Sequence, residues 1–200
     1  MLQAIEQAKI GDVVPVYKVV ENIDALDYFA KISDYGRNKN AVLLEFNEKI
    51  IGSISPCLKL TGFKESFEIT ALNALGKKFL AFIKNDFKFC KAQYIKNKII
   101  GSIKQEKRAV SEEQRLRLKS HMDVIAQVAF KFKPTLKPFI PYCGLFGFFS
   151  YDIMEHFEDL PESSNLNEPY YEFYFLDNLF VMDKDRIYFI ANALIMDDKK

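Results

Sequence analysis

The alternation of hydrophobic and polar residues along the chain predicts many short strands. Residues 13–19, VVPVYKV, are mainly β-branched or aromatic, and AVLLEF at 41–46 is typical of a buried strand. Glycine and proline interrupt the later apolar runs, as expected of short strands joined by turns. These runs predict strands over 49–55, 57–61 and 66–72, a hairpin over 88–104, a strand around GLFGFFSYD, and a hairpin with strands 171–182 and 186–195.

Three segments show helical signals instead. One helix is predicted from Asn22, which can act as its N-cap, to Gly36, which can end it, and a shorter one over 77–85. The clearest pattern covers 112–132, where apolar residues recur at intervals of three and four. Ser111 and the glutamine three residues after it have the spacing of a capping box, so this helix is predicted to begin there.

Together these elements predict the α+β class: mainly antiparallel β-sheets flanked by a few helices, in a single domain over 1–200. Hydrophobic residues make up 49% of the chain and charged residues 28%, a globular composition that excludes a disordered chain. No apolar run reaches the roughly 20 residues of a membrane span, and the N-terminus lacks a signal-peptide pattern. We therefore expect a cytoplasmic protein with no membrane partner.

The three cysteines, Cys57, Cys90 and Cys143, lie far apart and form no CxxC pair. This pattern argues against a disulfide framework and against a cysteine zinc site, and it favours a reducing compartment.

Charge is distributed unevenly along the chain. Residues 61–140 carry 17 basic and 7 acidic residues, whereas residues 141–200 carry 4 basic and 12 acidic ones. A basic segment with interleaved aromatic residues can bind nucleic acid, but it can also pack against an acidic segment or form a solvated surface. Because no nucleic-acid-binding motif accompanies the basic residues, we expect no nucleic-acid partner.

Recognisable catalytic motifs are scarce. His121 and His156 lack metal-ligand spacing, and the chain contains neither a GxSxG nucleophile motif nor a glycine-rich phosphate loop. Four acidic residues near position 158 can in principle bind a cation, but they are more simply the polar side of a short helix and its exit loop. These four are Glu155, Glu158, Asp159 and Glu162. We predict no catalytic residue and no metal ligand in this chain.

One segment has a distinctive sequence that points to a known family. GLFGFFSYDIMEHFEDLP, residues 144–161, resembles a stretch in the N-terminal region of anthranilate synthase component I, a chorismate-utilising enzyme. AVLLEF resembles the Leu-Leu-Glu-Ser element of that family, and SPCLKL at 55–60 is similar to its Ser-Pro-x-Leu-x-Leu strand. The last predicted hairpin also resembles the end of the family's N-terminal portion. The resemblance runs from about Pro15 to Leu194 and is most specific in 144–161.

The resemblance implies a role in tryptophan biosynthesis, where chorismate and ammonia or glutamine give anthranilate in a lyase reaction. In the family, the chorismate pocket, the magnesium-binding glutamates and the acid–base residues lie in a C-terminal catalytic domain. We expect that domain to be absent here, so this chain is not catalytic by itself and needs no Mg²⁺ of its own. The implied partners are the chorismate-binding catalytic half and a glutamine amidotransferase subunit. An apolar surface left exposed is also compatible with a homo-oligomer.

The resemblance further implies a feedback pocket for tryptophan. Carried over residue by residue, Leu44 and Glu45 match the family element, Lys49 matches a nearby basic position, and Phe46 stands where the family has serine. Glu45 can bind a ligand's ammonium group, or it can reach solvent or Lys49. Phenylalanine lacks a hydroxyl and adds a ring, so we expect Phe46 to impair tryptophan binding and feedback.

Two alternatives stay open. The same domain occurs in aminodeoxychorismate synthase component I, on the folate route, and the sequence does not separate the two firmly. The chain can also be a stand-alone, non-catalytic binding module that keeps this fold.

Overall fold

The computed structural model describes residues 2–21, 23–46, 48–103, 118–135, 137, 139, 142–156, 168–184 and 186–197. The chain forms two compact units, each assembled from separate stretches of sequence. The first unit comprises residues 1–57, 132–144 and 174–200, and the second comprises 58–131 and 145–173. The sequence predicted one domain over 1–200. The structure divides the same range into two compact units, and the chain passes between them several times.

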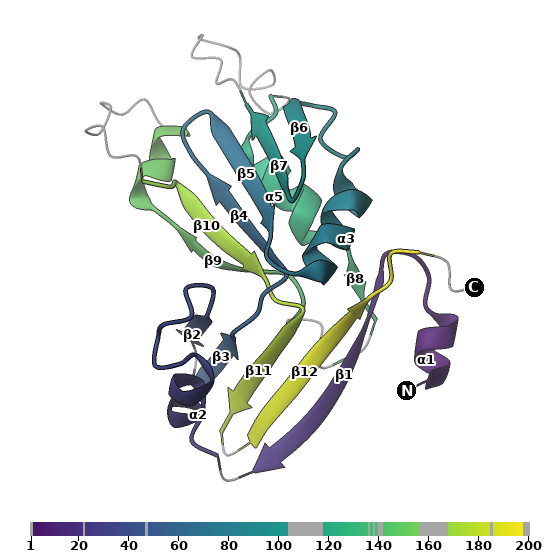
Figure 1. Ribbon diagram of the computed structural model, residues 1–200, viewed down its shortest axis with the longest axis vertical. Coiled ribbons are helices and arrows are strands. Elements are labelled where there is room, and N and C mark those ends of the chain that lie inside the picture. The colour runs from purple at the N-terminus through teal and green to yellow at the C-terminus, as the bar shows by residue number, and fades with distance from the viewer. Residues whose placement is uncertain are drawn as a thin grey trace. The chain divides into compact units, whose positions relative to one another are not determined.

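The first unit is built on a six-stranded sheet of order β2-β3-β11-β12-β1-β8 (Figure 1). Its long strands are antiparallel, and only the short pairing of β1 with β8 is parallel. The strands are β1 (Asp12–Glu21), β2 (Val42–Phe46), β3 (Lys49–Ser53), β8 (Lys133–Pro134), β11 (Asn178–Asp183) and β12 (Arg186–Leu194), with helices α1 (Leu2–Gln7) and α2 (Ala25–Ile32).

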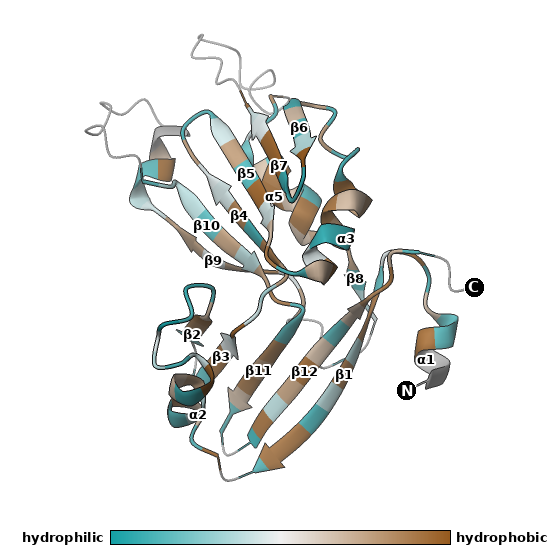
Figure 2. Ribbon diagram, viewed as in Figure 1, coloured by the Kyte–Doolittle hydropathy of each residue, from teal (hydrophilic) through white to brown (hydrophobic). Residues whose placement is uncertain are grey.

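Helix α2 packs on one face of this sheet. Asp24 is its N-cap: the carboxylate accepts hydrogen bonds of 2.9 Å from the backbone N–H groups of Leu26 and Asp27. The predicted cap, Asn22, lies outside the described residues, and the helix begins three residues after it. Hydrophobic and hydrophilic bands are visible along β1 and β12 in Figure 2. Successive side chains of a strand point to opposite faces of the sheet.

The second unit contains the other six-stranded sheet, of order β6-β7-β5-β4-β10-β9. Its core is formed by residues with no more than 1% exposure from the strands and from helix α3, among them Leu60, Phe67, Phe79 and Tyr171. The elements are β4 (Leu58–Gly62), β5 (Ser66–Ala71), β6 (Lys91–Ile95), β7 (Lys98–Ser102), β9 (Leu145–Phe149), β10 (Tyr171–Phe175), α3 (Ala74–Ile83), α5 (His121–Ala129) and the 3-10 helix η2 (Tyr151–His156).

The α+β class with mainly antiparallel sheets is confirmed. The hairpin predicted over 88–104 is also confirmed as β6 and β7, with Lys96 at φ 52° in the turn. Within the described parts of the chain, no helix is long and apolar enough to cross a membrane.

Two predicted elements are wrong. Over the described residues 118–132, the predicted helix is shorter: α5 covers only His121–Ala129, because Ser120 has extended backbone angles and forms a capping box with Asp123. The rest of the predicted helix, with its cap at Ser111, lies outside the described residues. The strand predicted over 171–182 is two strands, since the chain leaves one sheet after Phe175 and enters the other at Asn178. Apolar periodicity does not reveal such a change of sheet.

Candidate functional site

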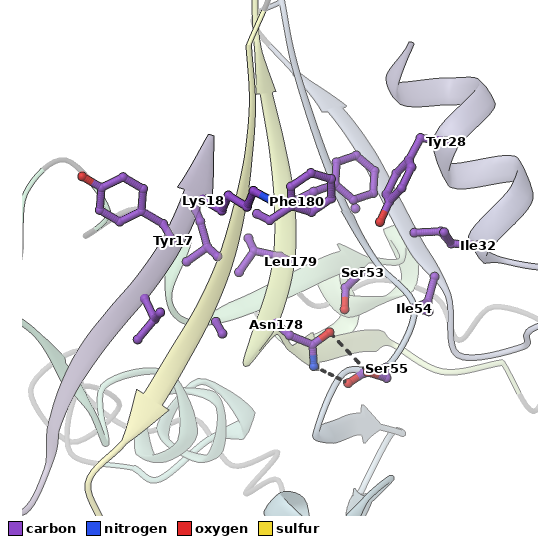
Figure 3. Close-up of a pocket in the computed structure, with 15 residues that line it drawn as sticks. Tyr17, Lys18, Tyr28, Ile32, Ser53, Ile54, Ser55, Asn178, Leu179 and Phe180 are labelled. Atoms are coloured by element: carbon purple, nitrogen blue, oxygen red, sulfur yellow. Dashed lines mark hydrogen bonds between the residues drawn. The ribbon is translucent and has the colours of Figure 1, made fainter. Parts of the chain in front are cut away.

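A groove lies on the α2 face of the first unit's sheet (Figure 3). Two rows of directly opposed residues from neighbouring strands form its floor. The first row is Lys18, Phe189, Phe180 and Gly52, from β1, β12, β11 and β3. The second row is Val16, Ala191 and Asn178, from β1, β12 and β11. Antiparallel pairing therefore brings four distant stretches of sequence to one surface, which we call the α2 groove.

Aromatic rings form the deeper side of the α2 groove. Phe180 is only 3% exposed, and its ring lies over Gly52, where an added Cβ atom would collide with the ring carbons. Tyr28 of α2 packs edge-on against Phe180 and Phe189, with ring centroids 5.6 and 5.2 Å apart. Glycine at position 52 is thus needed for the aromatic cluster to form.

The groove exists because α2 is short. Its eight residues span about 12 Å, whereas the ten residues of β1 span about 33 Å. Ala25, Phe180 and Ile187 form a buried cluster under the helix, and Tyr28 and Ile32 close one side of the groove. The uncovered remainder of the sheet face leaves a cavity of about 470 Å³, which lies within the usual size range of ligand sites.

One end of the α2 groove is polar. The Ser55 hydroxyl donates to Oδ1 of Asn178 over 3.2 Å, and Nδ2 of Asn178 donates to the Ser55 carbonyl over 3.1 Å (Figure 3). The same Nδ2 also donates to Asp177, whose pKa is raised because the carboxyl group is buried. These groups bond to one another, so they set the shape of the groove.

Lys18 supplies a positive charge at the β1 end of the first row. It is exposed, and it is the only charged residue among the described residues that line the groove. Within the described part of the chain, it has no ion pair or side-chain hydrogen bond. The α2 groove is therefore an apolar, aromatic cavity with one uncompensated positive charge at its rim.

The residues predicted for the tryptophan pocket lie elsewhere, on the hairpin of β2 and β3. Phe46 pairs with Lys49 in the backbone register, Leu44 is half-buried and Glu45 is exposed. Leu44, Glu45 and Lys49 are not among the described residues that line the α2 groove. Strand alternation places Lys49 on the opposite face from Gly52.

Lys49 already has partners in the first unit. Its ammonium group lies 3.0 Å from Oδ2 of Asp183 and donates to the Tyr142 hydroxyl over 3.4 Å. The hydrogen bonds to Asp183 and Tyr142 raise the pKa of Lys49 above its ordinary value. A ligand carboxylate at this hairpin would therefore compete with Asp183.

The remaining titratable candidates are held in neutral forms by burial. His121 lies in the second unit with Nδ1 2.9 Å from the Tyr171 hydroxyl, and burial lowers its pKa. Burial raises the thiol pKa of Cys57 and brings that of Cys143 to about 12. Neither thiol is activated as a nucleophile, because a nucleophilic cysteine needs a lowered pKa.

Among the described residues, no group of three or more histidine, cysteine or acidic side chains could hold a metal ion. Glu158, Asp159 and Glu162 lie outside the described residues, as does the side chain of Glu155.

Sequence reasoning identified none of the residues of the α2 groove as functional. The available signal was a lysine at position 18 within an apolar strand and aromatic residues at 180 and 189. That signal is usable only once the strand register is known. No family model matches the chain, and the comparison with curated proteins finds no match.

Proposed function

We propose that this chain is the N-terminal structural and regulatory portion of an anthranilate synthase component I, and that it is not catalytic by itself. The observation that carries the proposal is the segment 144–161, the most specific part of the resemblance. It begins with β9, an edge strand of the second unit's sheet among the described strands.

The packing of β9 supports a structural requirement for this motif. A Cβ atom at Gly147 would collide with backbone atoms of Glu172 and Phe173 on β10, so a glycine is needed for the two strands to approach. The residues that follow carry exposed rings: Phe148 is 54% and Tyr151 is 84% exposed. Exposed aromatic residues at a sheet edge suit a protein–protein contact. We propose the chorismate-binding half as the partner, joined in the enzyme by a glutamine amidotransferase.

The regulatory part of the proposal concerns the β2–β3 hairpin. Glu45 is exposed and available to a ligand's ammonium group. Lys49 lies on the opposite face of the hairpin and is paired with Asp183, so it does not supply a partner for the carboxylate of the same ligand. Both the missing partner and the replacement of serine by Phe46 weaken the site. We propose that tryptophan binds here weakly.

The test is capture of partners by the tagged chain from its native cells, with identification by mass spectrometry. A chorismate-binding polypeptide is expected together with a glutaminase. Tyr151→Asp should reduce their recovery, whereas Phe130→Asp should not, because Phe130 is an equally exposed ring (84%) elsewhere in the second unit. Recovery of neither polypeptide would overturn the proposal.

A second assay addresses catalysis. The purified chain with chorismate, Mg²⁺ and ammonia should form no anthranilate, whereas the captured complex should form it. Product fluorescence from the chain alone would contradict the non-catalytic assignment.

A further inference from the structure

We propose that the α2 groove is a second binding site, and that its ligand is a small aromatic carboxylate without an ammonium group. The site is separate from the tryptophan pocket proposed at the β2–β3 hairpin and does not depend on it. Lys49 and the α2 groove lie on opposite faces of the sheet, and Glu45, which shares the groove's face, is not among the described residues that line it.

The lining favours an aromatic ring. Tyr28, Phe180 and Phe189 present ring edges and faces around a cavity of about 470 Å³, which suits a one- or two-ring molecule. A small residue provides the space: the exposed Ala191 carries only a methyl group between Val16 and Asn178. A flat ring can therefore stack along the second row against the aromatic first row.

The positive charge of Lys18 favours an anionic group on the ligand. Lys18 lies directly opposite Phe189 in the register, so its alkyl stem can follow the ring while its ammonium group meets an anion at the rim. Figure 3 shows the Lys18 side chain extending from β1 in the direction of Phe180. A carboxylate attached to the bound ring pairs with this charge.

The same lining disfavours amino acids and amines. No aspartate or glutamate is among the described residues that line the groove. A ligand ammonium group would lose hydration without gaining a counter-ion, and it would lie near Lys18. Aromatic acids are thus preferred over aromatic amino acids of the same size.

Three indole compounds test this preference directly. Indole-3-propionate carries only the carboxylate, tryptamine carries only the ammonium group, and tryptophan carries both on a matched two-carbon chain. The protein contains no tryptophan residue, so indole fluorescence reports the ligand alone. We expect titration by fluorescence anisotropy to show indole-3-propionate binding, with tryptamine at least tenfold weaker.

Two variants assign the site. Ala191→Phe places a ring on the exposed floor and should weaken indole-3-propionate binding at least tenfold. Lys18→Met keeps the alkyl stem and should weaken it about fivefold, as expected for an exposed ion pair. Lys133→Met removes an exposed lysine from β8 of the same sheet, outside the groove, and should leave the affinity unchanged. Thermal melts of each variant verify folding.

The outcomes separate this site from the tryptophan pocket. Phe46→Ser should leave indole-3-propionate binding unchanged, even where it increases tryptophan binding. The α2-groove assignment is overturned if indole-3-propionate does not bind at millimolar concentration, if tryptamine binds equally well, or if Ala191→Phe, while folded, binds as the parent does. None of these results bears on capture of the catalytic half.

Discussion

The two units use the same packing device with opposite results. In the second unit, the ring of Tyr171 lies over Gly62 and the ring of Phe67 lies over Gly101, and both aromatic residues are at most 1% exposed. In the first unit, the ring of Phe180 lies over Gly52 in the same way, but it borders the α2 groove. One sheet face is filled and the other is left open.

The difference lies in what covers the ring. Tyr171 is held from its far end by His121 of α5, through the 2.9 Å contact between its hydroxyl and Nδ1. Phe180 is covered by α2, which is too short to extend over the rest of the sheet. A glycine beneath an aromatic ring therefore serves a closed core in one unit and a ligand-sized cavity in the other.

The largest expected effect comes from adding one methyl group under each ring. Gly62→Ala should destabilise the second unit by about 3 kcal/mol, the upper part of the range for overpacking, because Tyr171 is held at both ends. Gly52→Ala should cost the first unit only about 1 kcal/mol, because Phe180 can turn into the groove. Denaturant unfolding monitored by hydrogen exchange measures the loss in unfolding free energy of each unit.

The same pair of variants gives a binding control. Turning Phe180 into the groove would fill it, so Gly52→Ala should also weaken indole-3-propionate binding, whereas Gly62→Ala should not at temperatures where it is folded. Equal destabilisation by the two variants would remove the proposed distinction between a closed and an open face.

A smaller effect is expected at the hairpin of the first unit. Phe46→Ser restores a hydroxyl and removes a ring, so tryptophan should bind at least tenfold more tightly, a gain of about 1.4 kcal/mol. Fluorescence of the added tryptophan measures this affinity. Phe46→Leu, which removes the ring without adding a hydroxyl, is the matched control for size alone.

Tight binding of tryptophan to the unmodified chain would contradict the impaired pocket, and so would an unchanged affinity in a folded Phe46→Ser variant.

The smallest expected effect is a difference between the two units in how their stability depends on pH. Burial lowers the pKa of His121, so the unfolded state binds the proton first as pH falls through the ordinary value of 6.5. The stability of the second unit should therefore decrease between about pH 7 and pH 5. Burial raises the pKa of Asp177 in the first unit, so its folded form takes up a proton more readily and this unit gains stability as pH falls through the raised value.

Hydrogen exchange at several pH values resolves the two units. His121→Gln should flatten the dependence in the second unit, and Asp177→Asn should do so in the first. If acidification over this range stabilised the second unit, or if His121→Gln left its pH dependence unchanged, the neutral state assigned to His121 would be wrong.

The sequence predicted strands and helices well where neighbouring residues alone determine them. The β-branched and aromatic residues of VVPVYKV identified β1, alternation of apolar and polar residues identified the β6–β7 hairpin, and the excess of strands identified the α+β class. It failed at Leu176 and Asp177, where one apolar run serves two sheets. It also extended α5 across Ser120, because helical spacing continues on both sides of a residue whose backbone is extended.

The candidate site was not predictable in the same way. Lys18, Phe189, Phe180 and Gly52 are spread over more than 160 positions of the chain, and nothing in their local sequences links them. Only the register of three strand pairs makes them neighbours.

By itself, the amino-acid order determined which segments become strands, which residues face a core, and which short stretch resembles a known enzyme family. These properties depend on side-chain chemistry and on the two- and 3.6-residue periods of the backbone. Tertiary structure alone decided that Lys18 meets an aromatic row, that Lys49 is paired with Asp183, and that a cavity remains beside α2. Strand order, register and helix length set those contacts, and they arise from packing between segments far apart in the chain.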